Sequence, residues 1–391
     1  MDITITPQRL SGAVAAIPSK SQAHRLLICA AFADHPTTLY CPDTNRDIEA
    51  TAACLGALGA TVERTATGYF VSPCEKVPSD AVLDCCESGS TLRFLLPIAG
   101  ALGVNATFLM SGRLPQRPLS PLWEEMERMG CSLSRPTENT ILCRGKLRPG
   151  HYRIDGGVSS QFITGLMLAL SLLEQESRLE ITGNVESKPY IEMTRQAMTL
   201  FGADPDRPGA LPFRSPGELT VEGDWSNGAF FLAANALGCD ITVTNLSDSS
   251  AQGDRAIAQL LPRLENDCPT ISAAHIPDLV PILAVVAGAR QGALFTDIRR
   301  LRLKETDRVA TVSAMLESLG AQVEVTENAL RVFPAAYRGC VIDAANDHRI
   351  AMAAAIAATV ADGPVTVLGA EAVNKSYPSF WEEYRRLGGI L

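Results

Sequence analysis

The chain has 391 residues, of which 46% are hydrophobic and 20% are charged, and both fractions are ordinary for a folded globular protein. This length exceeds what one hydrophobic core usually supports, so two domains are expected. The formal net charge of −9 argues against a surface built to bind nucleic acid or an anionic membrane. A local basic pocket is still compatible with this charge.

The N-terminal residues and the cysteines indicate a cytoplasmic protein. The first residues alternate like a β-strand and lack the charged and apolar regions of a secretion signal. The longest apolar stretch, residues 351–361, is about half as long as a membrane-spanning helix requires. Neither the 11 cysteines nor the 5 histidines have the spacing of a zinc site. We therefore expect reduced thiols, no transmembrane segment and no metal.

Six segments resemble one another, because each begins with polar residues and continues as a run of small and apolar ones. They span residues 18–33, 87–102, 158–173, 224–237, 275–289 and 345–359. Their starting points recur at a nearly regular interval, with one shorter step before the fifth segment. Each run has the composition of a helix that protein covers on all sides, so six buried helices are predicted.

A second, charged type of helix is predicted between these segments, within residues 46–62, 121–134, 191–205 and 304–323. Several of these helices end in Leu-Gly or Met-Gly, and glycine commonly follows the last turn of a helix. The residues that follow are strand-like, and residues 60–71 and 321–333 are typical of β-hairpins. The repeat is therefore expected to be strand, buried helix, strand, amphipathic helix and two strands (βαβαββ).

Six such repeats suit two globular domains of three repeats each, since the interval is longer than that of the common solenoid proteins. The predicted fold class is α/β (α+β), with buried parallel helices in both domains. The strand at residues 3–6 is compatible with either domain. We predict domains at residues 20–221 and at residues 1–19 with 222–391, and hinges near 15–20 and 219–223.

The polar residues open the buried helices, where backbone N–H groups and the helix dipole favour anions. Serine and glycine supply most of these positions, namely Ser19, Ser21, Ser88, Gly89, Ser90, Ser159 and Ser160. Each serine taken alone is most simply an N-cap. Four cations lie in the same turns, namely Lys20, Arg25, Arg93 and Arg349. Positive charge is unfavourable there unless an anion lies between the cation and the helix end, so the pattern favours an anion-binding site.

Further cations and carboxylates extend the candidate set. Arg117 lies in a proline-rich loop, Arg308 lies in the KETDR segment that opens a helix of the second type, and Lys375 lies in VNKSYPS after the last buried helix. Arginine and lysine together suit phosphate and carboxylate groups. In such surroundings Asp278 and Glu305 could act as general base and general acid. An aspartate at a helix start is usually a cap, however, and a Lys-Glu step is usually a surface pair.

These motifs together resemble the 5-enolpyruvylshikimate-3-phosphate (EPSP) synthase family, or 3-phosphoshikimate 1-carboxyvinyltransferases. The resemblance covers nearly the whole chain, from PSKSQAHR at residue 18 to NKSYPSFWEEY at residue 374. KETDR and NDHR are the most specific motifs, and they occur in order with SGSTLR, GGVSSQF and ESKPYIEMT. The resemblance implies the enolpyruvyl transferase fold, an inside-out α/β barrel whose two domains close on the substrates.

The resemblance also implies the reaction. The enolpyruvyl group of phosphoenolpyruvate would pass to the 5-hydroxyl of shikimate 3-phosphate, with release of phosphate, on the pathway to chorismate and the aromatic amino acids. It implies a monomer that needs no metal and no organic cofactor. The domain at 20–221 would hold shikimate 3-phosphate, and the other domain would supply the acid and the base.

Matching motif positions assigns the two substrates and the proton transfers. Asp278 is expected to take the proton of the 5-hydroxyl, and Glu305 to protonate the methylene carbon, with Lys20 as the alternative donor. Shikimate 3-phosphate is expected to contact Lys20, Ser21, Arg25, Ser159, Ser160, Gln161, Ser187, Tyr190, Asp278 and Lys304. Phosphoenolpyruvate is expected to contact Lys20, Gly89, Arg93, Arg117, Gln161, Arg308, Arg349 and Lys375.

The sequence departs from the commonest family pattern at a few positions. Glu87-Ser88-Gly89-Ser90 stands where many members have Asn-Ala-Gly-Thr, and Phe94 follows Arg93 in place of proline. Arg300 aligns with an asparagine that reaches the substrate in many relatives. These changes leave glyphosate sensitivity and substrate affinity open. Glu87 adds a negative charge near two anionic ligands unless an arginine pairs with it.

Two other functions remain as alternatives. UDP-N-acetylglucosamine 1-carboxyvinyltransferases usually carry a cysteine in the loop that matches residues 111–120, and this chain has none there. A non-catalytic anion-binding relative would be expected to have lost part of the acid, base and cation set, and all of those positions are occupied.

Overall fold

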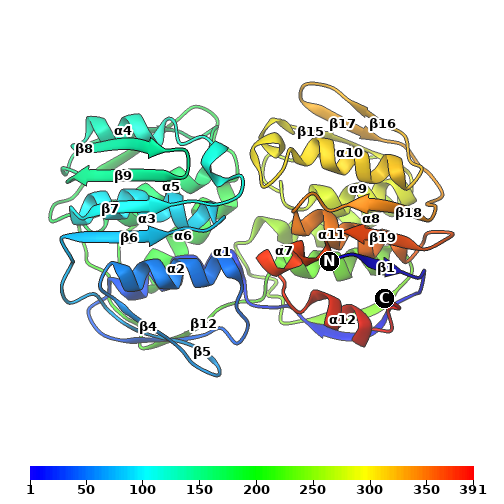
Figure 1. Cartoon of the computed structure of the whole chain (residues 1–391), viewed down its shortest axis with the longest axis horizontal. Coiled ribbons are helices and arrows are strands. Elements are labelled where there is room, and N and C mark those ends of the chain that lie inside the picture. The colour runs from blue at the N-terminus through cyan, green and yellow to red at the C-terminus, as the bar shows by residue number, and fades with distance from the viewer. The chain divides into compact units, whose positions relative to one another are not determined.

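The computed structural model describes all 391 residues, and in it the chain forms two compact units, each with its own hydrophobic core (Figure 1). Unit 1 comprises Met1–Ile17 and Glu222–Leu391, and unit 2 comprises Pro18–Val221. The chain therefore passes between the units twice. The hinge roles of these two connections stay a prediction.

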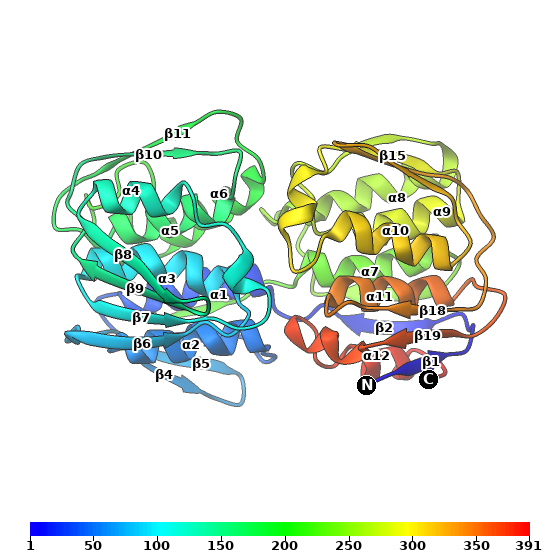
Figure 2. The ribbon, with the colours of Figure 1, turned by 45° about the horizontal axis from the view of Figure 1, so that its top comes forward.

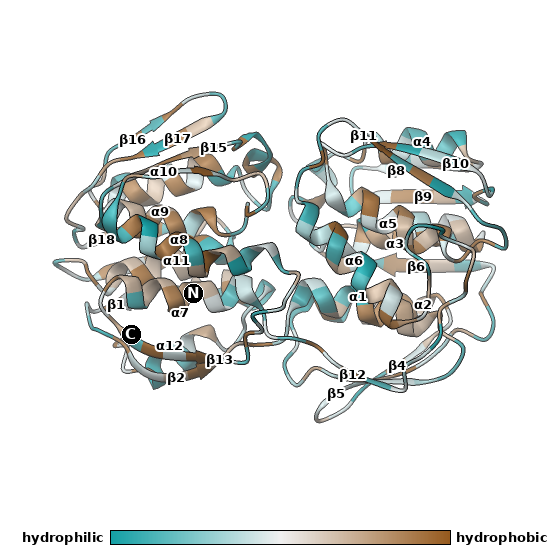
Figure 3. Cartoon of the chain, turned by 180° about the vertical axis from the view of Figure 1, so that it is seen from behind, coloured by the Kyte–Doolittle hydropathy of each residue, from teal (hydrophilic) through white to brown (hydrophobic).

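All six predicted buried helices are present. Unit 2 contains α1 (Lys20–Ala31), α3 (Gly89–Leu102) and α5 (Ser160–Leu170), and unit 1 contains α7 (Trp225–Ala236), α9 (Val280–Ala289) and α11 (His348–Ala358). Every residue of α11 is buried, because α11 packs against both α7 and α9. Hydrophobic residues accordingly dominate α9 and α11 in Figure 3. An apolar surface on all sides of a helix thus corresponds to a helix surrounded by protein.

The second helix type alternates with the first along the chain. These helices are α2 (Arg46–Ala57), α4 (Leu122–Arg128), α6 (Lys188–Leu200), α8 (Ile257–Asn266), α10 (Arg308–Ser318) and α12 (Phe380–Arg386). They bury one face only: in α2 that face carries Ile48, Thr51 and Leu55, spaced by three and four residues. Short 3₁₀ helices complete the set, namely η1 (Leu114–Gln116), η2 (Gly253–Ala256), η3 (Arg299–Leu303) and η4 (Ala370–Lys375).

Three repeats have a complete four-stranded sheet. In each sheet the first two strands are parallel and the remaining pairs are antiparallel. Both predicted hairpins are confirmed, since β4 pairs with β5 and β16 with β17. The strand orders are β12 (Glu218–Thr220), β3 (Thr37–Tyr40), β5 (Gly68–Ser72), β4 (Thr61–Arg64); β6 (Asp80–Asp84), β7 (Asn105–Leu109), β9 (Thr140–Gly145), β8 (Cys131–Thr137); and β14 (Thr270–Ser272), β15 (Ala293–Thr296), β17 (Ala329–Val332), β16 (Val323–Val325).

The other three repeats have shorter sheets, which Figure 2 shows on the outside of the helices. The strand predicted at residues 3–6 pairs within unit 1, because β1 is antiparallel to β19. The pairs are β10 (His151–Asp155) with β11 (Arg178–Thr182), β2 (Ser11–Ala15) with β13 (Asp240–Thr244), and β19 (Val365–Leu368) with both β1 (Ile3–Ile5) and β18 (Cys340–Asp343).

Two strands are exchanged between the units. β2 directly precedes α1 of unit 2, but it pairs in parallel with β13 of unit 1. β12 directly precedes α7 of unit 1, but it pairs in parallel with β3 of unit 2. Each unit therefore completes one sheet with a strand whose following helix belongs to the other unit.

Aspartates at strand ends direct the chain into the buried helices. The carboxylates of Asp84, Asp155 and Asp343 accept hydrogen bonds from the backbone N–H two residues later, at 2.9, 2.7 and 2.7 Å. This side-chain turn reverses the chain immediately after the strand. Capping residues follow: the predicted serine caps are confirmed at Ser19, Ser88 and Ser159, whereas Ser21, Ser90 and Ser160 lie inside the first turns and are not caps.

None of the helices combines the length and the apolar character that crossing a membrane requires. All 11 cysteines are free thiols.

Candidate active site

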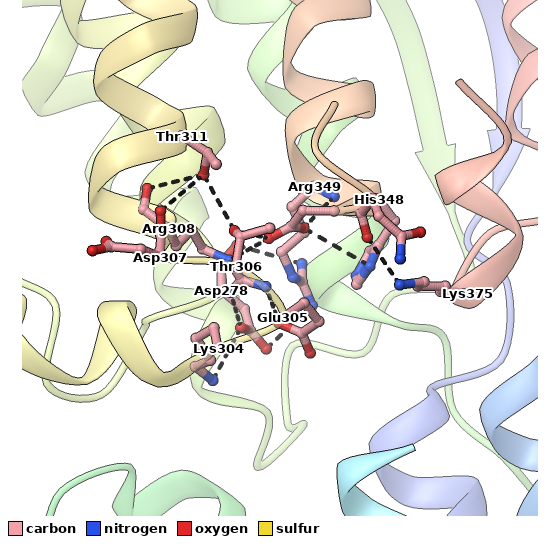
Figure 4. A network of polar contacts seen from close by, with 12 residues as sticks. Asp278, Lys304, Glu305, Thr306, Asp307, Arg308, Thr311, His348, Arg349 and Lys375 are labelled. Atoms are coloured by element: carbon pink, nitrogen blue, oxygen red, sulfur yellow. Dashed lines mark hydrogen bonds and ion pairs between the residues drawn. The ribbon is translucent and has the colours of Figure 1, made fainter. Parts of the chain in front are cut away.

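A cluster of carboxylates and cations surrounds Asp278 in unit 1 (Figure 4). Oδ1 of Asp278 accepts hydrogen bonds from Arg308 Nη1 at 2.7 Å and from Lys304 Nζ at 3.3 Å. Its Oδ2 lies 3.2 Å from Nη2 of Arg349. Burial alone would raise the pKa of Asp278, but Arg349, Lys304 and Arg308 hold the pKa well below its ordinary value. Asp278 is therefore a carboxylate at neutral pH.

Asp278 does not cap a helix. α9 begins at Val280, its cap position is Leu279, and no side chain caps it. The carboxylate of Asp278 is instead directed at the cations (Figure 4) and is only 16% exposed. The simplest interpretation of a helix-start aspartate, capping, therefore does not hold here.

Arg308 is the centre of this cluster, and its side chain is fully buried. As the first residue of α10, it directs three nitrogens at three carboxylates. Nε lies 3.0 Å from Asp347 Oδ2, Nη1 lies 2.7 Å from Asp278, and Nη2 lies 2.5 Å from Glu305 Oε2. Burial lowers the pKa of Arg308, but the three carboxylates raise it above its ordinary value. Arg308 thus fixes the candidate acid and base relative to each other.

Asp347 has two roles, and the sequence indicates only the first of them, the cap of α11. Its Oδ1 accepts the backbone N–H of Arg349 at 2.9 Å, so it caps α11 as a helix-start aspartate is expected to do. Its Oδ2 accepts from Arg308 Nε and from the hydroxyl of Thr306 at 3.1 Å. Lys375 contacts the residue before Asp347: its Nζ donates to the carbonyl of Asn346 at 2.9 Å (Figure 4).

Asp254 is a buried carboxyl that sequence reasoning missed. It lies on η2, accepts the hydroxyl of Ser226, and is 2% exposed. Burial, followed by the charge of Asp278, raises its pKa to about 7, against the opposing effect of Arg349. Its acid side chain in a polar Gln-Gly-Asp segment was the only signal in the sequence, and loops commonly carry such residues.

A second cluster in unit 2 is built on α1. Lys20, its first residue, lies 2.9 Å from Oδ2 of Asp47. Arg25 is 2% exposed and ties α1 to α5 and α6. It donates to the hydroxyls of Thr194 and Thr164 at 2.9 and 3.2 Å. It also donates to the carbonyls of Ser21 and Tyr190 at 2.6 and 2.9 Å. Burial lowers the pKa of Arg25 to about 10.

Ser187 stands before α6 in a strained conformation. Its φ of 53° and ψ of 38° lie in the left-handed region, which residues other than glycine, asparagine and aspartate rarely adopt. Its side chain makes no cap hydrogen bond to α6. Strain of this kind is concentrated at ligand sites. The strain therefore supports the prediction that Ser187 binds a ligand.

Two guanidinium groups converge on the N-terminus of α3. A Cβ at Gly89 would lie 2.5 Å from Arg117 Nη1 and 2.6 Å from Arg93 Nη1, so a side chain here would displace both guanidinium groups. Arg93 donates to the carbonyls of Gly89 and Pro118 at 3.4 and 3.2 Å. Gln161 of α5 donates to the hydroxyl of Ser90 at 3.0 Å. Four residues predicted to contact phosphoenolpyruvate are therefore gathered within unit 2.

The structure thus separates the predicted residues into two groups. Unit 1 gathers Asp278, Lys304, Glu305, Arg308, Arg349 and Lys375. Unit 2 holds Lys20, Ser21, Arg25, Gly89, Arg93, Arg117, Ser159, Ser160, Gln161, Ser187 and Tyr190.

Comparison with known proteins decides the family. The chain matches the family model for EPSP synthase (3-phosphoshikimate 1-carboxyvinyltransferase) over residues 5–272 and 265–384. It is 36% identical to the 3-phosphoshikimate 1-carboxyvinyltransferase of Clostridium kluyveri, over 100% of this chain and 98% of the relative. The same enzyme of Clostridioides difficile is 34% identical over 100% of this chain and 98% of its own length. The chain belongs to the EPSP synthase family.

Solved structures confirm the enolpyruvyl transferase fold. EPSP synthase from Acinetobacter baumannii superimposes with a TM-score of 0.78 and 20% identity, over 99% of this chain and 98% of that one. The enolpyruvyl transferase NikO from Streptomyces tendae gives a TM-score of 0.76 and 19% identity, over 99% and 97% of the two chains. The two-domain α/β architecture predicted from the repeats is therefore that of EPSP synthases.

The residues that depart from the common EPSP synthase pattern have defined surroundings. Glu87 lies against the loop that carries Arg117, since a Cβ at Gly112 would meet its Oε2 at 2.5 Å. Phe94 packs beneath α1, with the Cζ of Arg25 5.2 Å from its ring centroid and His24 edge-on at 6.2 Å. Phe94 thus fills space against α1, where proline would present a smaller and more rigid side chain.

Proposed function

We propose that this member of the EPSP synthase family transfers the enolpyruvyl group of phosphoenolpyruvate to the 5-hydroxyl of shikimate 3-phosphate, releasing phosphate. One observation carries the proposal: the cluster in which Arg308 joins Asp278, Glu305 and Asp347, with Lys304 and Arg349 on the same aspartate. A carboxylate base and a carboxyl acid on one guanidinium are suited to paired proton transfers. Family membership over the whole chain supports the same substrates.

Shikimate 3-phosphate is assigned mainly to unit 2. Ser159 and Ser160 at the start of α5, and Ser187 before α6, offer hydroxyls and helix N-termini to its phosphate. Arg25, which contacts no carboxylate of the protein, is suited to the substrate carboxylate. Other assigned contacts are Lys20, Ser21, Gln161 and Tyr190, with Asp278 and Lys304 of unit 1 on the ring hydroxyls.

Phosphoenolpyruvate is assigned to cations. Arg93 and Arg117 converge at Gly89 on the N-terminus of α3, where the helix dipole adds to their attraction for a phosphate or carboxylate. Lys20 and Gln161 complete this group in unit 2. Arg308, Arg349 and Lys375 of unit 1 are assigned to the same substrate. Because Arg308 is fully buried among carboxylates, its direct contact with phosphoenolpyruvate stays a prediction.

Asp278 is the proposed base. Without substrate, Arg349, Lys304 and Arg308 hold its pKa well below the ordinary value, against the effect of burial, so it is a poor proton acceptor. An anionic substrate on Arg349 would draw on the same positive charge and raise the pKa of Asp278. The base would therefore become effective once phosphoenolpyruvate is bound.

The reaction is an addition followed by an elimination. The 5-oxygen bonds to C2 of phosphoenolpyruvate while Asp278 takes the hydroxyl proton and the acid, Glu305, gives a proton to the methylene carbon. The resulting ketal then loses phosphate from C2, and the carboxylate of Glu305 removes a proton from the methyl group to restore the double bond. Asp278 gives the proton that it took from the hydroxyl to the departing phosphate. The surrounding cations stabilise the charge that develops on the phosphate.

The proposal is tested by mixing the purified chain with shikimate 3-phosphate and phosphoenolpyruvate, then measuring phosphate and the enolpyruvyl product by mass spectrometry. Turnover with UDP-N-acetylglucosamine and none with shikimate 3-phosphate would establish the alternative transferase. Binding of both substrates without product would establish a non-catalytic relative.

The identity of the proton donor can be tested separately. In deuterated water, reversible addition places deuterium on the methylene carbon of phosphoenolpyruvate. If Glu305 is the donor, Glu305→Gln abolishes this exchange with substrate affinities retained, and Lys20→Met weakens binding while exchange continues at saturation. The reverse result would assign the proton transfer to Lys20.

We also infer a cytoplasmic monomer that works without a metal or an organic cofactor, with shikimate 3-phosphate held by residues 20–221 and the acid and base supplied by residues 222–391. The cations of both clusters supply the positive charge that a metal would otherwise bring. Dialysis against EDTA should leave turnover unchanged, and sedimentation should give the 41.7 kDa mass of one chain. Loss of turnover that a divalent cation restores would refute the metal-free mechanism.

A further inference from the structure

A row of buried hydroxyls leads from His24 to the N-terminus of α3, and the proposed function does not use it. Nδ1 of His24 lies 2.7 Å from the hydroxyl of Thr51, which lies 2.7 Å from the hydroxyl of Thr91. Thr91 in turn donates to the hydroxyl of Ser88 at 2.7 Å. All four side chains are fully buried. The row therefore connects α1, α2 and α3 through atoms that water does not reach.

The proton on His24 sets the direction of this row. Nε2 of His24 is buried and has no hydrogen-bond partner. A buried N–H without an acceptor is rarer and costlier than a buried lone pair without a donor. Burial, together with Lys20 and Arg25, lowers the pKa of His24 well below its ordinary value, so the ring is neutral and carries one proton. That proton lies on Nδ1, and each hydroxyl donates to the next one toward Ser88.

The row ends at the residue that caps α3. The Ser88 oxygen accepts both the backbone N–H of Thr91 at 3.2 Å and the Thr91 hydroxyl, so both of its lone pairs are used. Thr91 also approaches the carbonyl of Asp47 at 3.4 Å, and the side chain of Asp47 holds Lys20. The ends of α1 and α3 that carry Lys20 and Gly89 are thereby fixed relative to each other.

Arg25, the residue after His24, connects α1 to a different pair of helices. Arg25 donates to Thr164 of α5 and to Thr194 of α6, whereas His24 begins the row to α2 and α3. Consecutive residues of one helix therefore hold two separate networks. The α5 and α6 network lies with the residues assigned to shikimate 3-phosphate, and the α2 and α3 row lies with those assigned to phosphoenolpyruvate.

We propose that His24 is a positioning residue for phosphoenolpyruvate, acting through Thr51, Thr91 and Ser88 to hold the N-terminus of α3 in place. The inference rests on the proposed function, which assigns Gly89 and Arg93, at the N-terminus of α3, to phosphoenolpyruvate and not to shikimate 3-phosphate. It gives a selective consequence: breaking the row weakens phosphoenolpyruvate binding and spares shikimate 3-phosphate.

A matched pair of variants at Thr51 tests this selectivity. Thr51→Val keeps the shape and removes the hydroxyl, whereas Thr51→Ser keeps the hydroxyl and removes the methyl group. We expect Thr51→Val to raise KM for phosphoenolpyruvate about tenfold, with KM for shikimate 3-phosphate within about twofold of the parent. Thr51→Ser should restore both values to within about twofold. Equal increases in both KM values, or the same defect in Thr51→Ser, would overturn the proposal.

A second hydroxyl keeps the test decisive if Thr51→Val does not fold. Thr91→Val should give the same selective increase, and the double variant should add little to either single one, because one break already interrupts the row. Fully additive effects would mean that the two threonines act independently and would refute the row. Turnover by the parent chain tests the proposed function alone. Failure of the proposed function can therefore be distinguished from failure of the positioning role of His24.

Nitrogen NMR of histidine-labelled protein gives a readout independent of activity. The His24 signals should show a protonated Nδ1 and a bare Nε2, and Thr51→Val should alter them. A proton on Nε2, or a doubly protonated ring near neutral pH, would contradict the direction of the row.

Discussion

The two units treat a buried arginine in opposite ways. Arg308 of unit 1 is matched to three carboxylates, which raise its pKa against the effect of burial. Arg25 of unit 2 is nearly as buried, yet its hydrogen bonds go only to hydroxyls and carbonyls, and burial lowers its pKa to about 10. A buried charge without a counterion is costly, and an anionic ligand relieves that cost. Unit 1 thus arranges its own acid and base, whereas unit 2 keeps positive charge available for a ligand.

The largest expected effect is on kcat, and it follows from removing Asp278, the carboxylate that Lys304, Arg308 and Arg349 all contact. Asp278→Ala should lower kcat at least about 100-fold, because the proposed base is lost. Phosphate release at saturating substrate concentrations measures the change. Asp248→Asn provides a control in the same unit, since Asp248 is an exposed carboxyl outside the cluster. A near-normal kcat for Asp278→Ala would move the role of base to another residue.

Stability should distinguish the two arginines directly. Arg308→Met leaves three carboxylates without their common partner and should cost about 3–5 kcal/mol in the free energy of unfolding. Arg25→Met should cost less than about 2 kcal/mol, because Thr164 and Thr194 still hydrogen-bond each other at 2.8 Å. Urea denaturation of the ligand-free variants checks both values. Equal losses of stability in the two variants would show that the carboxylate partners of Arg308 do not determine the cost of removing it.

The convergence of Arg93 and Arg117 can be disturbed with one methyl group. Gly89→Ala would place a Cβ 2.5–2.6 Å from their Nη1 atoms, so both guanidinium groups must move. We expect KM for phosphoenolpyruvate to rise about tenfold, the effect of losing one good hydrogen bond. Gly56→Ala in α2 is the control, since nothing lies within 4 Å of its added Cβ. An unchanged KM would remove the α3 N-terminus from the assigned site.

The smallest expected effect is a pH dependence that belongs to Asp254. Its pKa is raised from 3.8 to about 7, so the folded chain holds a proton that the unfolded chain has already lost. Raising the pH from 6 to 7 leaves this stabilising proton on only about half of the folded chains, and the free energy of unfolding should fall by about 1 kcal/mol. Asp254→Asn should abolish that fall. An identical pH profile in the variant would assign the titration to another group.

Much of the fold follows from the sequence alone, because a buried helix must be apolar on every side and a cap must be polar. These two requirements locate the six inner helices and identify Ser19, Ser88 and Ser159 as caps. The exchange of β2 and β12 could not be predicted, since the residues of a strand determine its exposed face and not its partner. Ser187 shows the same limit, because serine rarely adopts the left-handed backbone that it has here.

The sequence proposes candidate members of the site, but it misses Asp254 and gives no geometry. Motifs identify Asp278, Glu305 and Arg308, but nothing local indicates that one guanidinium joins both carboxylates. Asp347 illustrates why: its place before α11 predicts a cap, and its second oxygen serves Arg308 of a different helix. Hydrogen bonds between distant segments depend on the packed positions of whole helices, which no single segment encodes.

The exchanged strands have a consequence for the order in which the protein is made. Residues 18–221 form an uninterrupted stretch that contains every strand of unit 2, so this half can fold while the remainder is still on the ribosome. β1 and β2 leave the ribosome first, but their partners β19 and β13 are synthesised only in the second half of the chain. The N-terminal strands are thus the first to appear and among the last to pair. Both ends of the chain then meet, where the N–H of Thr6 bonds the carbonyl of Ile390 at 3.0 Å.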